Sequence, residues 1–328
     1  MITVREQSER FLAALETRRR NPVKSATLKA YRSYLRTWIV PKLGTLEVAA
    51  VENGILKGFV DYLVRRRLSP ATIAGIVATL KSLVGSEIDA NGNRVNPRAW
   101  NNAFVDAPPV DPSAQETPII TARELNAALA RSVAPYTQFY VLGASTGLRM
   151  SETMALRMGP DTGTGSFMDL DKMTLFVRSA ISHQRQEQST KSVAGVREVD
   201  LHHSVVTWLR DKFPERKQGE YLFQSAVGGP WHITTLYDHT KQDGIPGTHS
   251  LRRFRTTHLE NMSVPRVLVD YWTGHAGKAI TDRYTKLGRS IDARRKWCAH
   301  AGIGFHLPGT TEDVIVDLYG EPELEEVL

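Results

Sequence analysis

The sequence predicts a mainly α-helical chain of two domains, with a small antiparallel β-sheet in the second domain. Apolar residues recur at helical spacing along most of the chain, whereas the stretch 173–201 alternates as β-strands do. The segment DAPPVDPSAQETP, at 106–118, is rich in proline and small polar residues, which is typical of an interdomain linker. A chain of 328 residues is long enough for each domain to bury its own core.

We expect the first domain, residues 1–107, to be a helical bundle, followed by a linker over residues 108–118. The helical patterns of this domain cover residues 4–16, 25–43, 52–66 and 69–84. Pro41 is expected to end the second of these helices, because proline cannot continue a helix. Ser69 is the expected N-cap of the last one, with Pro70 at its first helical position.

The second domain is expected over residues 119–308, and its first helix opens with a capping box formed by Thr121 and Glu124. Two strands follow in MTLFVRSA and REVDL, and the segment QRQEQSTKSVAG between them is expected to be a polar turn region. These strands predict the small antiparallel sheet. Helical patterns resume at residues 204–214, 232–240, 249–261, 264–273 and 278–300.

Positive charge is concentrated in the body of the chain. The overall net charge is +7, but residues 1–308 hold 42 basic against 28 acidic residues and so carry +14. The first 110 residues hold 17 basic and 9 acidic residues, so the excess extends into the first domain. This density predicts a polyanionic partner such as duplex DNA, and a generic basic protein is the alternative.

The sequence shows no secretion signal and no segment that predicts a membrane span. The N-terminus is charged, and no uncharged apolar run approaches the roughly 20 residues needed to cross a bilayer. We therefore expect an intracellular protein without a membrane partner. The single cysteine, Cys298, excludes an internal disulfide and a cysteine-rich zinc module, and is expected to be a packing residue.

A dense group of cations lies in GTHSLRRFRTTHL, at 247–259, where His249 and Arg252 are three residues apart. Like charges at this spacing repel one another unless an anion lies against them. Arg253 and Arg255 lie on the same helix and are expected to contact flanking phosphates or to form salt bridges.

Five further residues carry potential chemistry, although each has an ordinary structural explanation when taken alone. Arg149 and Glu152, in TGLRMSE, have the spacing of an intrahelical salt bridge. Lys191 lies at the tip of the expected hairpin, where a lysine is usually a solvated charge. His275 follows Gly274, and Tyr284 lies nine residues later.

In this order the motifs TGxRxxE, TK in a hairpin, HxxR, GH and Y resemble the catalytic set of the tyrosine recombinase (lambda-type phage integrase) family. The gaps between the residues that carry the resemblance are 42, 58, 26 and 9 positions, and are similar to those of the family. The first domain also looks like the helical, SAM-like core-binding domain of these proteins. The resemblance implies that this domain and a mixed α/β catalytic domain form a clamp around DNA.

The chemistry of these residue types agrees with the resemblance. A phosphodiester is negatively charged, so its cleavage needs cations directed at the oxygens on which charge grows in the transition state. The guanidiniums of Arg149 and Arg252 suit this role, because they bind phosphate oxygens in pairs and stay charged. His249 and His275 can add hydrogen bonds or move protons near neutral pH.

The resemblance assigns the covalent steps to the remaining residues. Tyr284 would attack phosphorus and form a 3′-phosphotyrosyl link, while Lys191 would donate a proton to the departing 5′ oxygen. His249 is the candidate base for the phenol, and Glu152 is expected to orient Arg149. No metal and no cofactor is expected, because cations and proton donors supply the catalysis. Further phosphate contacts are expected from Arg18, Arg19, Arg20, Lys24, Arg65, Arg66 and Arg67.

Residues 309–328 form an acidic tail that combines seven carboxylates with large apolar side chains. We expect this tail to dock on a neighbouring protomer, since the resemblance implies homotetramers on DNA that exchange C-terminal segments. Packing on its own chain, or remaining disordered, is the alternative.

The sequence thus predicts a site-specific recombinase of a phage or other mobile element, acting in the cytoplasm of a bacterial host and associated with the nucleoid when DNA-bound. A resolvase of the chromosome-dimer type and a noncatalytic DNA-binding protein of the same fold are alternatives. Directionality or architectural factors are further partners that the resemblance allows.

Overall fold

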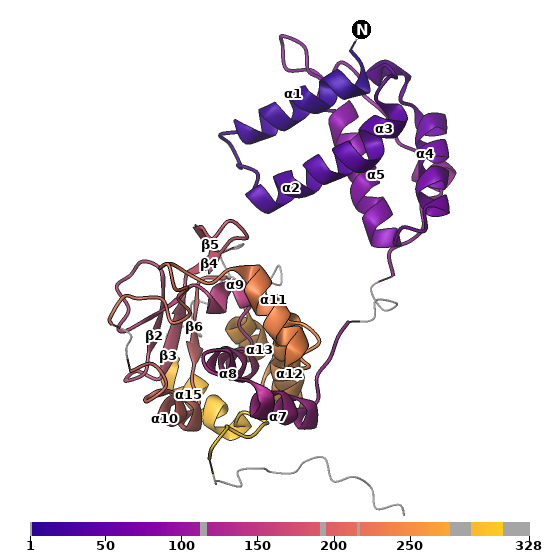
Figure 1. Cartoon of the computed structure of the whole chain (residues 1–328). Helices are drawn as coiled ribbons and strands as arrows, with labels where there is room; N and C mark the ends of the chain where they lie inside the picture. Colours follow the sequence, from indigo (N-terminus) through magenta and orange to yellow (C-terminus); the bar gives the residue numbers. More distant parts are fainter. Residues whose placement is uncertain (1, 112–116, 191–194, 215–216, 276–289, 311–328) are drawn as a thin grey trace, which may run out of the picture. The chain divides into compact units, whose positions relative to one another are not determined.

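The computed structural model of the 328-residue chain describes residues 2–111, 117–190, 195–214, 217–275 and 290–310. The chain divides into two compact units after residue 116, and each unit has its own hydrophobic core (Figure 1). This division falls within the segment 108–118 that was expected to be a linker. No helix of the described residues is long and apolar enough to span a membrane.

The first unit is a helical bundle around one apolar core. Its helices are α1 (Val4–Glu16), α2 (Ser25–Tyr34), η1 (Leu35–Ile39), α3 (Val40–Leu43), η2 (Val48–Ala50), α4 (Asn53–Arg65), α5 (Pro70–Val84) and α6 (Asn102–Val105). The side-chain oxygen of Ser69 accepts a hydrogen bond from the backbone of Thr72, as expected of the N-cap of α5. Ile73 and Leu80 of the α5 stripe are buried, with 1% and 0% exposure.

Pro41 does not end its helix, which is a correction. The helical conformation continues from α2 through the π-helical segment η1 and ends only at Leu43, the last residue of α3. In the π-helical turn Val40 donates to the carbonyl of Leu35, five residues back. This wider turn accommodates Pro41, whose backbone nitrogen carries no hydrogen and cannot donate a hydrogen bond.

The second unit surrounds a small mixed sheet with helices. Its strands are β1 (Leu156–Met158), β2 (Ser166–Asp169), β3 (Thr174–Val177), β4 (Ser179–Ile181), β5 (Glu187–Ser189) and β6 (Arg197–Asp200). Its helices are α7 (Ala122–Arg131), α8 (Tyr136–Thr146), α9 (Met150–Thr153), α10 (His203–Leu209), α11 (Ile233–Gln242), α12 (Thr248–Asn261), α13 (Arg266–Thr273) and α15 (Ile291–Ala301). The prediction of a mainly helical fold with a small sheet is confirmed.

The two expected strands, β3 and β6, pair antiparallel as predicted, but the sheet also contains a parallel pair that was not expected. The four-stranded sheet has the order β1-β2-β3-β6, and β1 pairs with β2 in parallel, while the other pairs are antiparallel. A strand as short as Leu156–Met158 gives no alternation to detect. The segment expected as a polar turn also contains β5, which pairs with β4 in a separate two-stranded hairpin.

The other expected elements of this unit are present with shifted ends. Thr121 and Glu124 form the predicted capping box of α7. The helix expected at 204–214 is shorter, as α10, and the helix expected at 278–300 falls partly outside the described residues, which show α15. Cys298 is buried, as expected of a packing residue.

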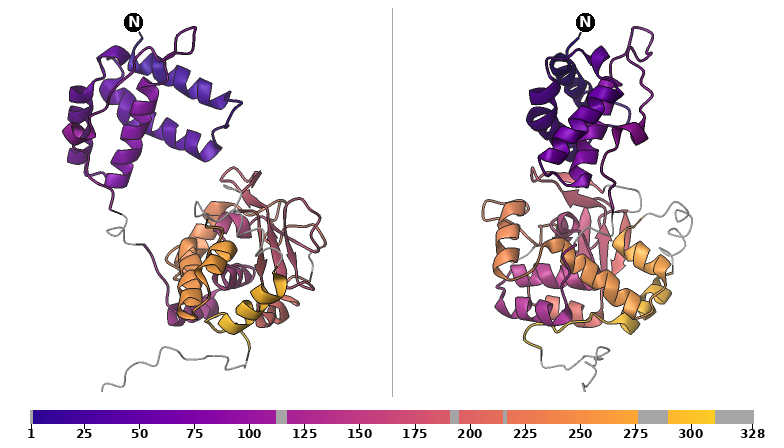
Figure 2. Two further views of the ribbon diagram at one scale, coloured as in Figure 1. Left: turned by 180° about the vertical axis from the view of Figure 1, so that it is seen from behind. Right: turned by 90° about the vertical axis from the view of Figure 1, so that its right-hand side faces the viewer.

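Helix α8 is the central element of the second unit, lying between the sheet and helices α12 and α13 (Figures 1 and 2). Its residues from Thr137 to Thr146 are all buried. Helix α12 packs closely against it at Gly143, where an added Cβ would lie 3.0 Å from Cδ1 of Leu251. Helix α8 ends at Gly147, whose positive φ of 69° is readily adopted by glycine.

Two partly buried histidines make the stability of this unit depend on pH. Burial and the nearby charge of Arg255 lower the pKa of His258 to about 4, and burial together with His203 lowers the pKa of His202 to about 4. The unfolded chain therefore binds protons below about pH 6.5 that the folded chain resists.

We expect the thermal midpoint to fall as the pH is lowered from about 7 to about 5, because the folded-state pKa values lie below those of the unfolded chain. The variant His258→Gln, which keeps a donor for the carbonyl of Ala301, should show a smaller fall. Thermal unfolding followed by circular dichroism at both pH values tests this. An equal fall in the variant and the parent would contradict it.

Candidate active site

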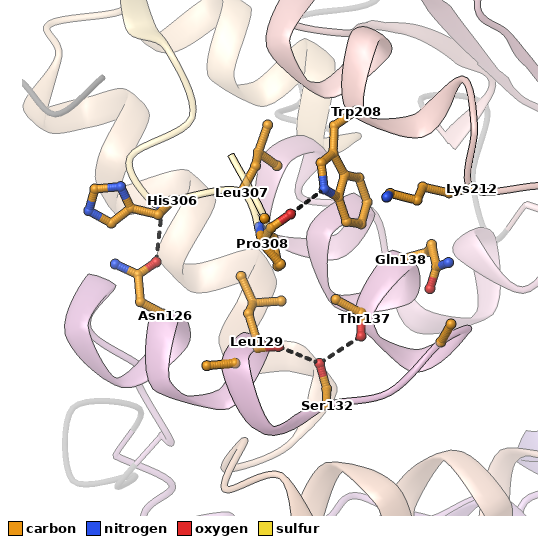
Figure 3. Close-up of a pocket in the computed structure, with 13 residues that line it drawn as sticks. Asn126, Leu129, Ser132, Thr137, Gln138, Trp208, Lys212, His306, Leu307 and Pro308 are labelled. Atoms are coloured by element: carbon orange, nitrogen blue, oxygen red, sulfur yellow. Dashed lines mark hydrogen bonds between the residues drawn. The ribbon is translucent and has the colours of Figure 1, made fainter. Parts of the chain in front are cut away.

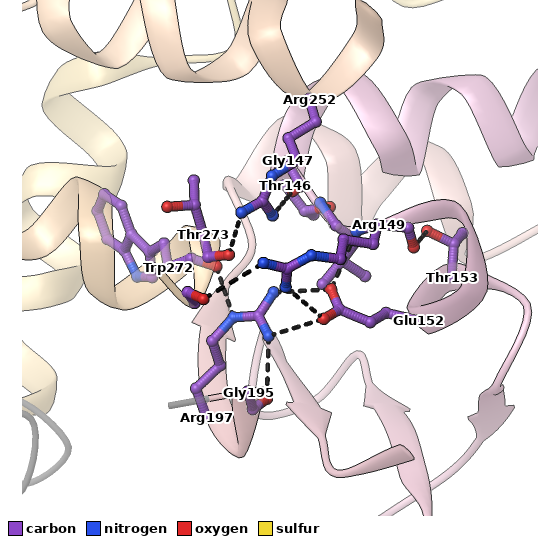
Figure 4. Close-up of polar contacts among 12 residues, drawn as sticks. Thr146, Gly147, Arg149, Glu152, Thr153, Gly195, Arg197, Arg252, Trp272 and Thr273 are labelled. Carbon is purple, nitrogen blue, oxygen red and sulfur yellow. Dashed lines mark hydrogen bonds and ion pairs between the residues drawn. The ribbon is translucent and has the colours of Figure 1, made fainter. Parts of the chain in front are cut away.

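The C-terminal end of α13 gathers arginine side chains from different parts of the second unit. The last carbonyls of a helix have no partner within the helix and lie at the negative end of its dipole. Three consecutive carbonyls here accept hydrogen bonds from three different guanidiniums (Figure 4). The pairs are Arg197 Nε with Trp272 O at 2.7 Å, Arg252 Nη2 with Thr273 O, and Arg149 Nη2 with Gly274 O at 3.4 Å.

Arg149 is fixed by Glu152 at the start of the short helix α9. Arg149 is the N-cap residue of this helix, and its backbone N–H donates to Glu152 Oε2 at 2.9 Å. Its Nη1 also donates to Glu152 Oε1, at 2.9 Å. The expected pairing of these residues is therefore present. The side chain of Arg149 is 36% exposed, whereas that of Glu152 is only 3% exposed, so the guanidinium is the part that can meet a ligand.

Arg252 extends from α12 into the same cluster and is buried. Its Nη1 donates to the carbonyl of Gly147 at 2.6 Å, so it connects the C-terminal ends of α8 and α13. Burial and the nearby charge of Arg149 lower the pKa of Arg252 to about 9. This value remains above neutral pH, so the guanidinium stays charged and the cluster keeps a positive field.

His275 lies beside Arg252, and its hydrogen-bond partners indicate which ring nitrogen carries the proton when the imidazole is neutral. Nη2 of Arg252 lies 3.0 Å from His275 Nε2, and a guanidinium can only donate. The hydroxyl of Thr273 donates to Val269 O and so accepts from His275 Nδ1, at 3.1 Å. Burial, Arg252 and Arg149 all lower the pKa of His275. The imidazole therefore carries its proton on Nδ1.

His249 lies on the same helix as Arg252, one turn earlier. Burial lowers its pKa, and the positive charges of Arg253, Arg252 and Arg149 lower it further. The neutral form can accept a proton, which is what a base must do. The structure thus brings Arg149, Glu152, Arg252 and His275 together through hydrogen bonds, and His249 lies one turn of α12 before Arg252, where the charges of Arg252 and Arg149 act on its imidazole. Lys191 and Tyr284 lie outside the described residues.

Arg197 is a member of the cluster that the motif analysis did not identify. It lies on β6, its side chain is 0% exposed, and its Nη2 donates to Glu152 Oε2 at 2.9 Å. A signal for it exists in the sequence, because period-two alternation places Arg197 on the same strand face as Val199, which is buried.

The expected phosphate-binding arginines and lysine of the first unit are on its surface. Residues 18–20 and Lys24 lie between α1 and α2, and residues 65–67 lie at the end of α4; all are exposed. In the second unit Arg253 is half-buried and donates to Pro118 O at 2.7 Å. These phosphate contacts stay predictions.

The structure contradicts the expected phosphate contact of Arg255. Its side chain is buried within the second unit, with 3% of the residue exposed, and Nη1 donates to the carbonyl of Gly302 at 2.7 Å. Because a buried guanidinium cannot reach a flanking phosphate, Arg255 has a structural role. It joins α12 to the end of α15.

A groove of about 540 Å³ lies near the other end of α8, between α7, α10 and the segment 306–309 (Figure 3). It is lined by apolar residues such as Leu129 and by the polar groups of Lys212 and His306. The side-chain oxygen of Gln138, another lining residue, is buried without a hydrogen-bond partner. Residue 310, the last described one, follows directly on this groove.

Within the described ranges no group of three or more His, Cys, Asp or Glu side chains is placed to hold a metal ion. The site is instead dominated by guanidiniums and imidazoles. It can bind an anion, orient it through paired donors and exchange protons with it near neutral pH.

Residues 121–290 match the model of the phage integrase family. The chain belongs to this family. Its fold is similar to that of the Tn1549 transposon integrase in complex with a circular intermediate DNA, with a TM-score of 0.65, 18% identity and coverage of 90% of this chain and 99% of that chain. No curated protein sequence matches the chain.

Lambda integrase structures are similar as well. A dimer of the lambda fragment bound to a COC′ core site has a TM-score of 0.60 and 16% identity, and the match covers 86% of this chain and 95% of that chain. A lambda tetramer bound to a Holliday junction has a TM-score of 0.58 and 16% identity, covering 84% and 78%. These likenesses establish the tyrosine recombinase fold.

The neutral state of His275 is testable without DNA. Burial lowers its pKa, and so do the charges of Arg252 and Arg149, so the variant Arg252→Gln should raise the pKa by removing one cation. NMR titration of the His275 imidazole measures this. The variant Arg210→Gln, on the surface beside Asp171, is the control and should leave the titration of His275 unchanged. An unchanged pKa in Arg252→Gln would contradict the proximity of the two groups.

Proposed function

We propose that this integrase-family chain is a site-specific DNA recombinase that cleaves and rejoins strands through a 3′-phosphotyrosyl intermediate. The observation that carries the proposal is the convergence of Arg149, Arg252 and the imidazole of His275 at the end of α13, with His249 one turn away on α12. Such a cluster holds more positive charge than Glu152 balances, and a phosphodiester supplies the missing anion.

In this proposal the exposed guanidinium of Arg149 binds a non-bridging oxygen of the scissile phosphate, and the charge of the buried Arg252 beside it stabilises the negative charge of the phosphate. The phosphate brings negative charge beside His275, which opposes the two cations that now lower its pKa. His275 can then become protonated and donate a hydrogen bond to the growing charge. His249, neutral and next to the same arginines, accepts the proton of the nucleophile.

The nucleophile is Tyr284, nine residues beyond His275 in the sequence. An extended segment of this length spans up to about 30 Å, so the phenol can serve this site or that of a neighbouring protomer. The phenol oxygen forms a bond to phosphorus while the bond to the 5′ oxygen breaks, and Lys191 donates the proton that this oxygen takes up. The tyrosyl ester conserves the bond energy, so a 5′ hydroxyl of another strand can reverse the step without a metal or a nucleotide cofactor.

The biological role follows from the same chemistry. Integration and excision of a phage or other mobile element require such reversible strand exchange, and the solved integrases with a similar fold are bound to DNA. A bacterial cytoplasm, with the protein on the nucleoid, is the corresponding location. A chromosome-dimer resolvase would use the same residues. A noncatalytic DNA-binding protein would not need both guanidiniums and both imidazoles in one cluster.

The covalent step can be tested even though the target sequence is unknown. The chain is incubated with a pool of nicked duplexes of random sequence, and protein–DNA adducts are separated on denaturing gels and sequenced. We expect an adduct with the parent chain and none with Tyr284→Phe, because only the phenol oxygen can bond to phosphorus. Tyr237→Phe, an exposed tyrosine of α11, is the control and should form the adduct. Adducts that persist in Tyr284→Phe would overturn the mechanism.

We further propose that residues 309–328 dock on a neighbouring protomer and thereby join a homotetramer on DNA. A solved lambda integrase is a tetramer on a Holliday junction, which supports such an assembly. The tail follows directly on the groove that Lys212 and His306 line. Its acidic and apolar residues match the charge and the apolar walls of the equivalent groove in a partner.

Deletion of residues 309–328 should abolish DNA-dependent tetramers while leaving the DNA affinity of the monomer within about twofold, because the tail has no basic residue with which to bind phosphate. Sedimentation of the protein with the duplex identified in the adduct experiment measures both tetramer formation and DNA affinity. Replacing Val314, Val316 and Leu318 together by serine keeps the charge and should also prevent assembly. Tetramers that form normally without the tail would eliminate this proposal.

A further inference from the structure

We propose that Arg197 is a positioning residue of the active site, through which strand β6 holds Arg149 and the end of α13 in a fixed relation. The inference rests on the proposed recombinase function and names a residue outside the predicted catalytic set. Arg197 does not itself touch DNA, since its side chain is 0% exposed.

The guanidinium of Arg197 donates in three directions. Nη2 and Nη1 bind the two oxygens of Glu152, at 2.9 and 3.3 Å, and Nε binds Trp272 O at 2.7 Å. Nη1 also donates to the carbonyl of Gly195 at 3.0 Å. One buried side chain therefore connects α9, the end of α13 and the chain that enters β6.

Glu152 transmits this constraint to Arg149. Its Oε1 accepts from Nη1 of Arg149 and from Nη1 of Arg197, while its Oε2 accepts from the Arg149 backbone and from Nη2 of Arg197. The carboxylate is thus shared between a buried arginine and a 36% exposed one. Without Arg197, the Glu152 carboxylate would be bound only by Arg149 and could move together with it. The guanidinium of Arg149 would then lose its fixed orientation.

The same residue acts on the other side of the site. Trp272 O is the first of the three carbonyls at the end of α13, and the next two bind Arg252 and Arg149. Displacement of α13 would move His275 as well, because His275 follows the helix directly and lies 3.0 Å from Arg252. Arg197 therefore sets the distance between the phosphate-binding groups on α9 and those near α13.

Lysine cannot replace arginine here. A guanidinium is a rigid planar fork that reaches a carboxylate with two nitrogens and a carbonyl with a third, whereas an ammonium is a single point on a flexible stem. Arg197→Lys keeps the buried positive charge beside Glu152 but leaves some of these acceptors unsatisfied. This substitution therefore distinguishes the effect of the positive charge of Arg197 from the effect of its hydrogen bonds.

The test compares Arg197→Lys, Glu152→Gln and the double variant with the parent chain on the duplex captured as a covalent adduct. Tyr140→Phe is the matched control, because it removes a buried hydrogen bond to Asp243 in the same unit and away from the arginine cluster. Two quantities are measured well below the thermal midpoint of each variant: the Kd for the duplex, and the single-turnover rate of adduct formation at saturating protein.

We expect Arg197→Lys to lower the rate roughly 100-fold, as a displacement of about 1 Å would, and to raise Kd by no more than the roughly tenfold loss expected for the scissile phosphate. Tyr140→Phe should keep the parent rate. The double variant should lose less than the sum of the two single losses, because both residues share the Glu152 carboxylate while Arg197 also binds Trp272 O. A parent-like rate in Arg197→Lys, a similar loss in Tyr140→Phe, or fully additive losses in the double variant would each overturn the inference.

A second measurement separates this inference from the proposed function. Inorganic phosphate is titrated against the His275 imidazole by NMR, and Arg197→Lys should weaken phosphate binding about tenfold relative to the parent. If the parent forms no DNA adduct, the recombinase proposal fails and this titration alone decides the role of Arg197. Equal phosphate affinity in Arg197→Lys and the parent would then reject it.

Discussion

The arrangement of the site depends on the hydrogen bonds between arginine side chains and the last carbonyls of helix α13. Arginines on β6, α9 and α12 are far apart in the sequence, and their charges repel one another. They meet because three consecutive carbonyls, Trp272 to Gly274, each accept from one guanidinium. The helix dipole makes this end partly negative, so backbone groups supply the attraction that brings like charges together.

This arrangement leaves the cluster with excess positive charge. Glu152 carries one negative charge and is shared by Arg149 and Arg197, while Arg252 is buried with backbone carbonyls and His275 as its partners. Burial and mutual repulsion lower the pKa of Arg252 and also lower the pKa values of His249 and His275. The folded chain thus stores an electrostatic strain that an anion relieves, and binding sites commonly hold strain of this kind at some cost in stability.

Local chemistry explains which features could be predicted from the sequence. Ser69 and the pair Thr121 and Glu124 define helix starts through short-range hydrogen bonds, so their roles were predictable. The motif containing Arg149 and Glu152 is also local. Arg197 contacts Glu152 across 45 positions, and no short motif contains both residues. The expectation that Pro41 ends its helix is wrong because a π-helical turn directly precedes the short helix that contains the proline.

Tertiary packing likewise decided which arginines are available. Arg253 and Arg255 are close in a basic stretch of α12, and the sequence gives both the same apparent role. The helix turns Arg255 inward to the carbonyl of Gly302, while Arg253 stays half-exposed. The parallel pairing of β1 could not be foreseen from three residues.

The close approach of α8 and α12 at Gly143 has a consequence for the variation that the chain tolerates. A hydrogen atom in place of a side chain lets two helices approach closely, of which one ends at Gly147 and the other carries Arg252. The volume of the side chain, and not its polarity, therefore limits which residues can replace Gly143. A methyl group there would require Leu251 Cδ1 to shift by a few tenths of an ångström or the helices to move apart, which would alter the span across which the proposed site would hold a phosphate.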